Sequence, residues 1–203
     1  MQSVCGNRHE LKVGATSILN AVTTEPDRLS FPRAETGLRE VRDDDIPLLF
    51  ALRRDRGLQS MLLTIPKAED DEALLAWIER RRGEPGGAFL AIENDGEAIG
   101  YIQVAQVHHK NRTGYGGIVI AEGRRGCGAG RAALHALLQF SRSRLGLRKL
   151  LAEIRSDNAP SIRLHLSLGY RVVGTLERHF ADTGGEIHDV LLLERLLEEE
   201  INA

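Results

Sequence analysis

A glycine-rich stretch in the middle of the chain limits the possible folds more than any other feature. Residues 116–134 contain a short apolar strand, a tight loop and the first turns of a helix. The strand residues 118–120 are all β-branched, which suits a buried strand. We expect Gly126, Gly128 and Gly130 to let the backbone take positive φ and approach a ligand closely. Such a loop directs several N–H groups toward one point at a helix N-terminus, so it is expected to bind an anion, usually a phosphate.

Two well-known phosphate loops are excluded because their defining residues are missing. No Gly-Lys-Ser/Thr ends this loop, so it is not a P-loop. Residues 126–130 read Gly-Cys-Gly-Ala-Gly, which is not a clean dinucleotide fingerprint, and no acidic residue ends a second strand about 20 residues further on. A glycine-rich turn by itself also suits a merely flexible connection, so the flanking elements decide its meaning.

The elements before the loop predict antiparallel strands and two helices. Apolar runs predict strands over residues 36–41, 88–93, 98–104 and 114–121. The tight-turn sequence 94–97 joins two of these strands into a hairpin, so three consecutive antiparallel strands precede the loop. Acidic residues at 43–45 and 70–72 are expected to cap the two helices.

The elements after the loop predict a parallel crossover and two closing strands. A helix is predicted over about residues 128–145, a strand over 148–155, and a second helix from 156–160 to a C-cap at Gly169. The strand, helix, strand unit predicts a right-handed parallel connection. Strands over 170–176 and 187–193 complete the set. The expected fold class is therefore α+β, with a mixed, mainly antiparallel sheet flanked by helices.

Length, charge and cysteine usage bound the remaining choices. The 203 residues suit one domain, which we place at residues 36–203 after a flexible N-terminal extension, 1–35, with a short helix over 11–22. A net charge of −2 argues against a general nucleic-acid binder, and no apolar run approaches a membrane span. Neither Cys5 nor Cys127 has other metal-ligating residues at a recognised spacing, so no metal site is predicted. With only these two cysteines no structural disulfide is expected, so a cytoplasmic location is expected. The acidic residues 198–200 are expected to form a solvated helix tip.

Two motifs carry a family resemblance. Arg125 to Gly130 resembles the pyrophosphate loop of the GCN5-related N-acetyltransferase (GNAT) family, Gln/Arg-x-x-Gly-x-Gly/Ala. Asn158, the run from Ser161 to His165 and the triplet 168–170 match the family pattern Asn-x-x-Ala/Ser-Ile-x-Leu-Tyr/His-x-x-x-Gly-Phe/Tyr. The resemblance covers roughly residues 36–196. Within the family, the chain is similar to the RimJ/RimL, spermidine and phosphinothricin acetyltransferase group.

The resemblance implies a GNAT acyl-CoA N-acyltransferase fold in which the central strands splay apart in a V that admits acetyl-CoA. The pyrophosphate would meet the loop, and the pantetheine arm would run along the preceding strand like an added strand. Asn158 would contact that arm or cap its helix, or both. The cofactor-binding residues implied are Ile118, Val119, Ile120, Arg124, Arg125, Gly126, Cys127, Gly128, Ala129, Gly130, Arg131, Asn158, Ser161 and His165.

The chemistry implied is direct acetyl transfer to a primary amine of a small molecule or protein N-terminus. The catalytic candidates are His165, which takes the place of a family tyrosine that donates a proton to the departing thiolate, and Tyr115, which takes the place of a carboxylate found in phosphinothricin-type enzymes. Backbone N–H groups near Val119 would polarise the thioester carbonyl. The general base is open between a relaying water and five side chains: Glu93, His108, His109, Glu122 and Asp189.

Two function classes remain open from the sequence. The first is the acetyltransferase, whose acceptor can be a polyamine, an amino sugar, an amino acid or a ribosomal N-terminus, and whose assembly can be a homodimer. The second is a CoA-binding sensor or interaction module that has lost catalysis. The position of Cys127 in the phosphate loop, away from the acetyl end, argues against a covalent acetyl-cysteine step.

Overall fold

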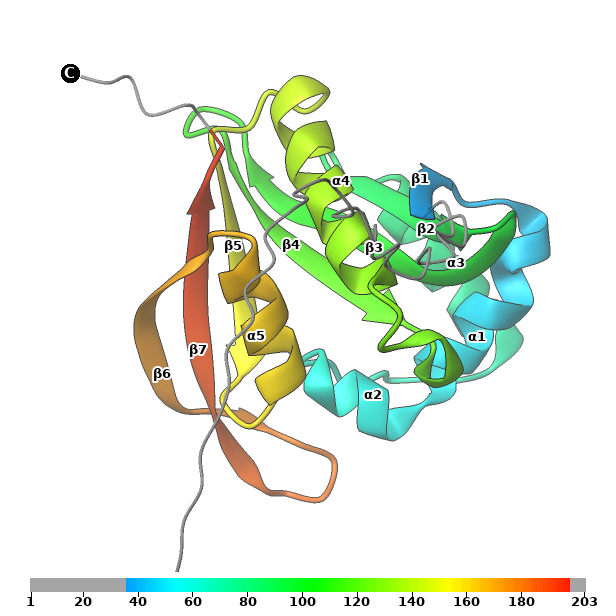
Figure 1. Cartoon of the computed structure of the whole chain (residues 1–203). Helices are drawn as coiled ribbons and strands as arrows, with labels where there is room; N and C mark the ends of the chain where they lie inside the picture. The colour runs from blue at the N-terminus through cyan, green and yellow to red at the C-terminus, as the bar shows by residue number, and fades with distance from the viewer. Residues whose placement is uncertain (1–35, 198–203) are drawn as a thin grey trace, which may run out of the picture. The chain divides into compact units, whose positions relative to one another are not determined.

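A seven-stranded sheet organises residues 36–197, the part of the chain that the computed structural model describes (Figure 1). The strand order is β1-β2-β3-β4-β5-β7-β6, and every neighbouring pair is antiparallel except β4 and β5. The strands are β1 (Thr36–Glu40), β2 (Ala88–Asn94), β3 (Glu97–His108), β4 (Thr113–Ile120), β5 (Lys149–Arg155), β6 (Arg171–Ala181) and β7 (Ile187–Leu196). This arrangement confirms the predicted α+β class. The predictions of a flexible N-terminal extension, of a short helix within it and of a solvated helix tip at 198–200 all lie outside the described residues.

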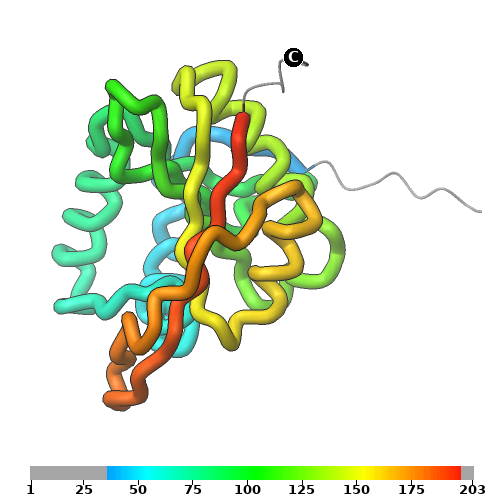
Figure 2. Tube along the Cα trace, turned by 90° about the vertical axis from the view of Figure 1, so that its left-hand side faces the viewer, coloured from blue at the N-terminus to red at the C-terminus, as the bar shows by residue number. Residues whose placement is uncertain are grey.

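Helices cover both faces of the sheet, and Figure 2 shows α4 and α5 on the side opposite to α3. The helical segments are η1 (Asp43–Asp45), α1 (Ile46–Arg54), α2 (Arg56–Met61), α3 (Asp71–Arg82), η2 (Glu122–Arg124), α4 (Ala129–Ser143) and α5 (Ala159–Ser167). None of the helices between residues 36 and 197 is long and apolar enough to cross a membrane.

Two hydrophobic clusters fix the helices to the sheet. On the face of α4, buried residues such as Leu134 and Leu137 pack with Ile102 of β3 and Leu150 of β5. On the opposite face, Trp77 of α3 packs edge-on against aromatic rings of β2 and β3, with centroid separations of 5.5 and 5.7 Å. Alternate residues of β3 and β4 therefore serve different layers, as the period of two in a strand requires.

The structure confirms most of the predicted boundaries and corrects one cap. Asp70 caps α3 by accepting a hydrogen bond from the N–H of Ala73, at 3.0 Å. Of residues 43–45, Asp45 caps the helical start in a different way from the one predicted: it makes no N-cap bond for α1 but accepts from the N–H of Arg42 as part of a capping box at η1. It is also buried and pairs with the guanidinium of Arg39 at 2.7 and 2.8 Å. A buried carboxylate needs a charged partner, and the first strand supplies it. Helix α2 was not predicted because its six residues are too short for an apolar period to show.

The sheet splits between its two central strands, as the family resemblance implies. Strands β4 and β5 pair only through residues 113–115 and 149–151, at one end. Figure 1 shows the strands meeting there and diverging toward the other end. Beyond the pairing, residues 116–120 of β4 remain paired to β3 only, and residues 152–155 of β5 to β7 only. The V-shaped splay is thus confirmed, and it leaves one open backbone edge along each arm of the V.

Candidate active site

A cleft of about 940 Å³ passes through the V and is lined from both faces of the sheet. Residues of the loop and of α5, among them Gly126 and His165, line one side, which we call the α4 side. Residues of α1, α3 and β3, among them Arg53, Trp77 and Tyr101, line the other, which we call the α3 side. A molecule on one side can therefore meet a molecule on the other only between the two diverging strands.

Two glycines of β4, Gly116 and Gly117, lie where the strand begins to diverge from β5. A Cβ added at Gly116 would meet Cδ2 of Leu137 in α4 at 3.5 Å, so this position faces the α4 side. A Cβ at Gly117 would meet Nε2 of Gln103 at 3.3 Å, so this position faces the α3 side. Because neither glycine carries a side chain, the backbone of β4 is accessible from both sides at this point.

The loop before α4 has the conformation expected of an anion site. Gly126 and Gly128 have φ values of +83° and +90°, which confirms the predicted positive φ at both positions. The prediction is wrong for Gly130, which lies in the first turn of α4, where a Cβ would touch Ile120 and Leu164. Within residues 36–197, no hydrogen bond takes up the backbone N–H groups of residues 126–130. Several unpaired donors at one helix N-terminus favour a bound anion.

The three loop arginines differ in where they point. Arg125 lines the cleft, and its Nε donates to the carbonyl oxygen of Ile120 at 2.9 Å. Arg131 also lines the cleft and donates to Ser167 on α5. Arg124 instead forms an exposed ion pair with Glu97, at 2.6 Å, and does not line the cleft. Of the other predicted cofactor residues, the cleft is not lined by Ala129 or by Cys127, an exposed free thiol.

The predicted residues of α5 meet at the α4 side of the cleft. Asn158, Ser161 and His165 all line it. The Oδ1 atom of Asn158 accepts from the N–H of Ser161 at 3.2 Å, which confirms the predicted N-cap. The predicted pantetheine residues 118–120 line the opposite wall of the same space.

His165 is held in one tautomer. Its Nδ1 lies 2.8 Å from the carbonyl oxygen of Ser161, which can only accept, so Nδ1 carries the hydrogen and Nε2 of the neutral ring has a lone pair. Burial lowers the pKa of His165, which favours the neutral ring. The proton-donor role implied by the resemblance would require the imidazolium form, which this environment disfavours.

The α3 side of the cleft contains Tyr115 and a carboxylate that sequence reasoning missed. Tyr115 is the last residue of β4 that pairs with β5, and it lines the cleft. On β5, Ala152 and Ile154 belong to the hydrophobic core beneath α4, so Glu153 between them faces the α3 side, where it is exposed and lines the cleft. The charged residue between two apolar ones was a signal in the sequence that the strand prediction did not use, and only the splay shows that Glu153 borders a cleft.

Of the five side chains predicted as possible bases, only Glu122 lines the cleft. Glu93 forms an ion pair with Arg39. Asp189 accepts from the N–H of Arg178 at 2.7 Å, and Nδ1 of His108 accepts from the N–H of Asn111 at 3.1 Å. His109 lies against Gly86, outside the cleft lining.

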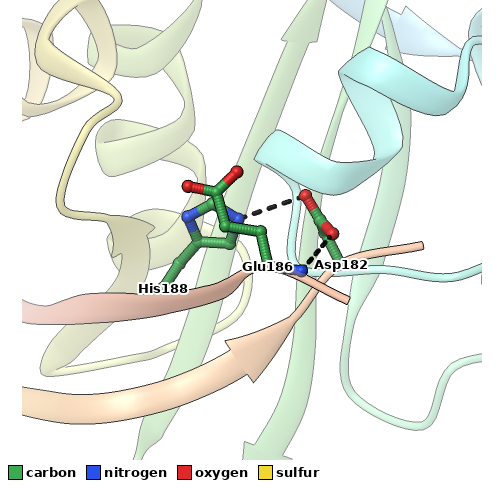
Figure 3. A group of neighbouring side chains, drawn as sticks. All are labelled: Asp182, Glu186 and His188. Atoms are coloured by element: carbon green, nitrogen blue, oxygen red, sulfur yellow. Dashed lines mark hydrogen bonds and ion pairs between the residues drawn. The ribbon is translucent and has the colours of Figure 1, made fainter. Parts of the chain in front are cut away.

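A second group of titratable side chains lies where β6 turns into β7. Figure 3 shows Asp182, Glu186 and His188 converging there, with ligand atoms within 4.8 Å of one another. Nε2 of His188 lies 3.2 Å from Oδ2 of Asp182, and Oδ1 accepts from the N–H groups of Gly184 and Glu186. The bond with His188 is the largest cause of the lowered pKa of Asp182. These bonds close the β6–β7 turn.

Comparison with known proteins identifies the family. Residues 53–170 match the model of the acetyltransferase (GNAT) family. The chain belongs to this family. The match spans more than half of the sequence and includes both motifs and the V. The protein is thus an N-acetyltransferase that uses acetyl-CoA.

Individual relatives agree with this assignment. An uncharacterized N-acetyltransferase of the SPbeta prophage in Bacillus subtilis is 29% identical over 167 residues, which cover 81% of this chain and 92% of that protein. An L-methionine sulfoximine/L-methionine sulfone acetyltransferase of Pseudomonas aeruginosa is 27% identical over 144 residues, 68% of this chain and 82% of that protein. The spermidine N-acetyltransferase of Vibrio cholerae, solved with CoA and spermine, shares the fold at a TM-score of 0.74 and 20% identity, over 80% of this chain and 95% of that one.

Proposed function

We propose that this acetyltransferase binds acetyl-CoA on the α4 side of the cleft and acetylates the primary amine of a small molecule that enters from the α3 side. The single observation that carries the proposal is the cleft through the V, because one continuous space is lined by the glycine-rich loop on one side and by residues of α1, α3 and β3 on the other. Direct transfer needs both reactants in contact at once, and only such a through-going cleft allows that contact.

The residues on the α4 side fit the cofactor. The unpaired N–H groups of residues 126–130, with Arg125 and Arg131 beside them, suit a pyrophosphate. The open edge of residues 116–120 suits an extended pantetheine arm, which would be held as an added strand. Asn158 would contact the arm in addition to capping α5.

The acetyl thioester supplies the acyl carbon: its C–S bond breaks as the new amide C–N bond forms. The N–H of Ala121 donates to Ile99 of β3, so the alternate residues Gly116, Ile118 and Ile120 direct their N–H groups to the open edge, where they would polarise the carbonyl oxygen. Glu153, on the α3 side, would accept the proton that the attacking amine loses, either directly or through water. Tyr115, beside the closed end of the V, would orient the amine.

His165 would orient the sulfur end of the cofactor without donating a proton to the departing thiolate. Its neutral Nε2 can accept a hydrogen bond from the cofactor's arm or thiol, so we assign it to orienting the sulfur end of the cofactor. The thiolate would then take its proton from solvent.

A small acceptor is favoured over a protein N-terminus by two considerations. The cleft of about 940 Å³ must hold part of the cofactor as well as the amine. Relatives named for small amines include the methionine sulfoximine and spermidine acetyltransferases, and the first of these matches 68% of this chain, against 47% for a relative named N-alpha-acetyltransferase.

The cofactor assignment is tested with a pair of glycine variants of the same region. Gly128→Val forces a β-branched side chain onto φ of +90°, whereas Gly123→Val adds one at an ordinary φ with open space around it. Calorimetry with acetyl-CoA should show binding to the native chain and to the Gly123 variant, and at least about tenfold weaker binding to the Gly128 variant. Equal affinities of both variants would contradict the assignment of the loop.

The base assignment is tested by Glu153→Gln, which keeps the size of the side chain and removes its basicity. Thiol release in the presence of an acceptor should fall by about 10² or more in kcat, with unchanged affinity for acetyl-CoA. An unchanged kcat would reject Glu153 as the base. Binding of acetyl-CoA without thiol release on any acceptor would favour the sensor, which no observation in the structure supports.

We also propose a reducing compartment and self-association. An exposed free Cys127 fits the cytoplasm. Strand β6 is an edge of the sheet, and Val172 and Val173 expose apolar surface along it, which favours contact with a second copy. Light scattering that reports only monomers would reject the homodimer.

A further inference from the structure

Two arginines face the α3 side of the cleft without a close carboxylate partner. Arg53 ends α1, Arg81 lies in the last turn of α3, and both line the cleft. Among residues 36–197, Arg53 forms no ion pair, and Nη1 of Arg81 is 3.8 Å from the nearest carboxylate oxygen, that of Glu84. The Nε atom of Arg81 is buried and has no hydrogen-bond partner in this part of the chain.

The next arginines on the same helices, Arg54 and Arg82, each form a close ion pair. Arg54 pairs with Asp71 at 2.5 Å, and Arg82 pairs with Glu79 at 2.8 Å. Both pairs lie on the exposed surface, where the net gain from an ion pair is small. The chain thus supplies close carboxylates to arginines that water already solvates. Among residues 36–197, it leaves Arg53 without an ion pair and Arg81 with only the longer 3.8 Å contact to Glu84.

The guanidinium of Arg53 is held in position by two side chains, those of Trp77 and Gln59. It lies over the ring of Trp77 at 5.1 Å and donates to Oε1 of Gln59. Gln59 is 1% exposed, and its Nε2 donates to the carbonyl oxygen of Leu52 at 2.8 Å. Gln59 is therefore a positioning residue that orients the planar fork of Arg53 before any ligand arrives. A preorganised fork loses less freedom when it binds an oxyanion.

The environment makes an added anion favourable. Burial lowers the pKa of Arg53, and the positive charge of Arg81 acts in the same direction. A partly buried guanidinium gains most from a charge-assisted hydrogen bond when no other anion already occupies it. The nearest acidic lining residue in the sequence, Asp55, is engaged in capping α2, since its Oδ1 accepts from the N–H of Leu58 at 2.9 Å.

We propose that Arg53 and Arg81 bind a carboxylate carried by the acceptor, so that the amine acetylated belongs to a free amino acid. The inference rests on the proposed function and deepens it by naming the substrate class. The charges across the α3 side match a zwitterion: Glu153 on β5 faces the ammonium group, and the two arginines on α1 and α3 face the carboxylate. A polyamine carries a second cation where the arginines lie, which repels it.

The experiment uses the full chain, acetyl-CoA and an equimolar mixture of free amino acids, their carboxamides, spermidine and spermine, with acetylated products identified by mass spectrometry. We expect products from one or more amino acids, and a kcat/KM at least about tenfold above that of the matching carboxamide. Equal or faster acetylation of the carboxamide, or products from the polyamines alone, would overturn the proposal while leaving the acetyltransferase function intact. A native chain that acetylates nothing in the mixture would overturn both.

Variants then assign the preference to the arginines. Arg53→Gln and Arg81→Gln should each raise KM for the amino acid by about 10- to 100-fold, with little change for the carboxamide or in affinity for acetyl-CoA. Arg54→Gln is the matched control, because it removes the same charge from the next residue of α1 outside the cleft lining. The proposal fails if all three variants behave alike, or if the preference for the carboxylate survives in both cleft variants. Unchanged thermal melting of either cleft variant separates loss of binding from loss of fold.

Discussion

Replacing Gln59 with leucine should lower the free energy of unfolding, because the Gln59 side chain of α2 forms hydrogen bonds with residues of α1. The side chain is almost fully buried and makes three hydrogen bonds: to the carbonyl oxygen of Leu52, from the hydroxyl of Thr64 at 3.0 Å, and from Arg53. Leucine fills nearly the same volume but makes none of them. The Leu52 carbonyl is then left buried without a partner, which costs about 1–3 kcal/mol. Thr64 and Arg53 are only partly buried and can turn to water, so they add about 1 kcal/mol together.

The expected loss of unfolding free energy is therefore about 2–4 kcal/mol, which corresponds to a melting temperature lowered by about 4–16 °C for a domain of this size. Urea unfolding followed by circular dichroism measures it, with Gln139→Leu as the control. Gln139 is an exposed glutamine of α4 whose side chain makes no hydrogen bond within residues 36–197. The same Gln59 variant should raise KM for the acceptor, because Arg53 loses its support.

Two outcomes would refute this reasoning. A loss below about 1 kcal/mol at an unchanged slope of the urea curve would mean that Gln59 does not satisfy a buried group. An equal loss in the Gln139 variant would mean that added surface leucine, and not the missing hydrogen bonds, explains the effect.

Two further predictions concern His165 of α5 and Tyr170, whose rings pack together. Because burial lowers the pKa of His165 below its ordinary value of 6.5, the unfolded chain binds a proton first as the pH falls. The contribution of His165 to stability is therefore complete above about pH 6.5 and declines below it. His165→Gln should flatten the slope of unfolding free energy against pH below about pH 6.5, and parallel slopes would disprove the shift. The hydroxyl of Tyr170 is buried with no partner among residues 36–197, and burial raises its pKa. Tyr170→Phe should accordingly leave stability unchanged or raise it by up to about 1 kcal/mol in thermal melts, and a loss above about 1 kcal/mol would reveal a partner such as a bound water.

The local features of the loop were predictable because they depend on backbone conformation that few residues allow. Positive φ at Gly126 and Gly128 follows from glycine's missing side chain, and the strand before them follows from its β-branched run. Gly130 shows the limit of the argument: a glycine in such a loop can also be present for close packing, here against Ile120 and Leu164. Sequence spacing does not distinguish the two uses.

The residues that face the acceptor were not predictable, because they come from separate elements. Arg81 appeared in the sequence as part of a basic triplet that matches the dipole at the end of a helix. The structure places only one member of that triplet, Arg81, in the lining of the cleft, together with Trp77 of the same helix. Glu153 likewise appeared as an ordinary strand residue, since nothing local indicates that the neighbouring strand diverges at its level.

The open edge of β4 has a consequence for the protein without its cofactor. Residues 116–120 form a flat, apolar strand segment with one unpaired edge, and such segments tend to pair with other chains and aggregate. Here the edge lies inside the sheet, between β4 and β5, and not at its outer border. A cofactor arm in that place would protect the strand as a neighbouring strand does elsewhere, so the cellular supply of acetyl-CoA would act as a folding aid for the enzyme as well as its substrate.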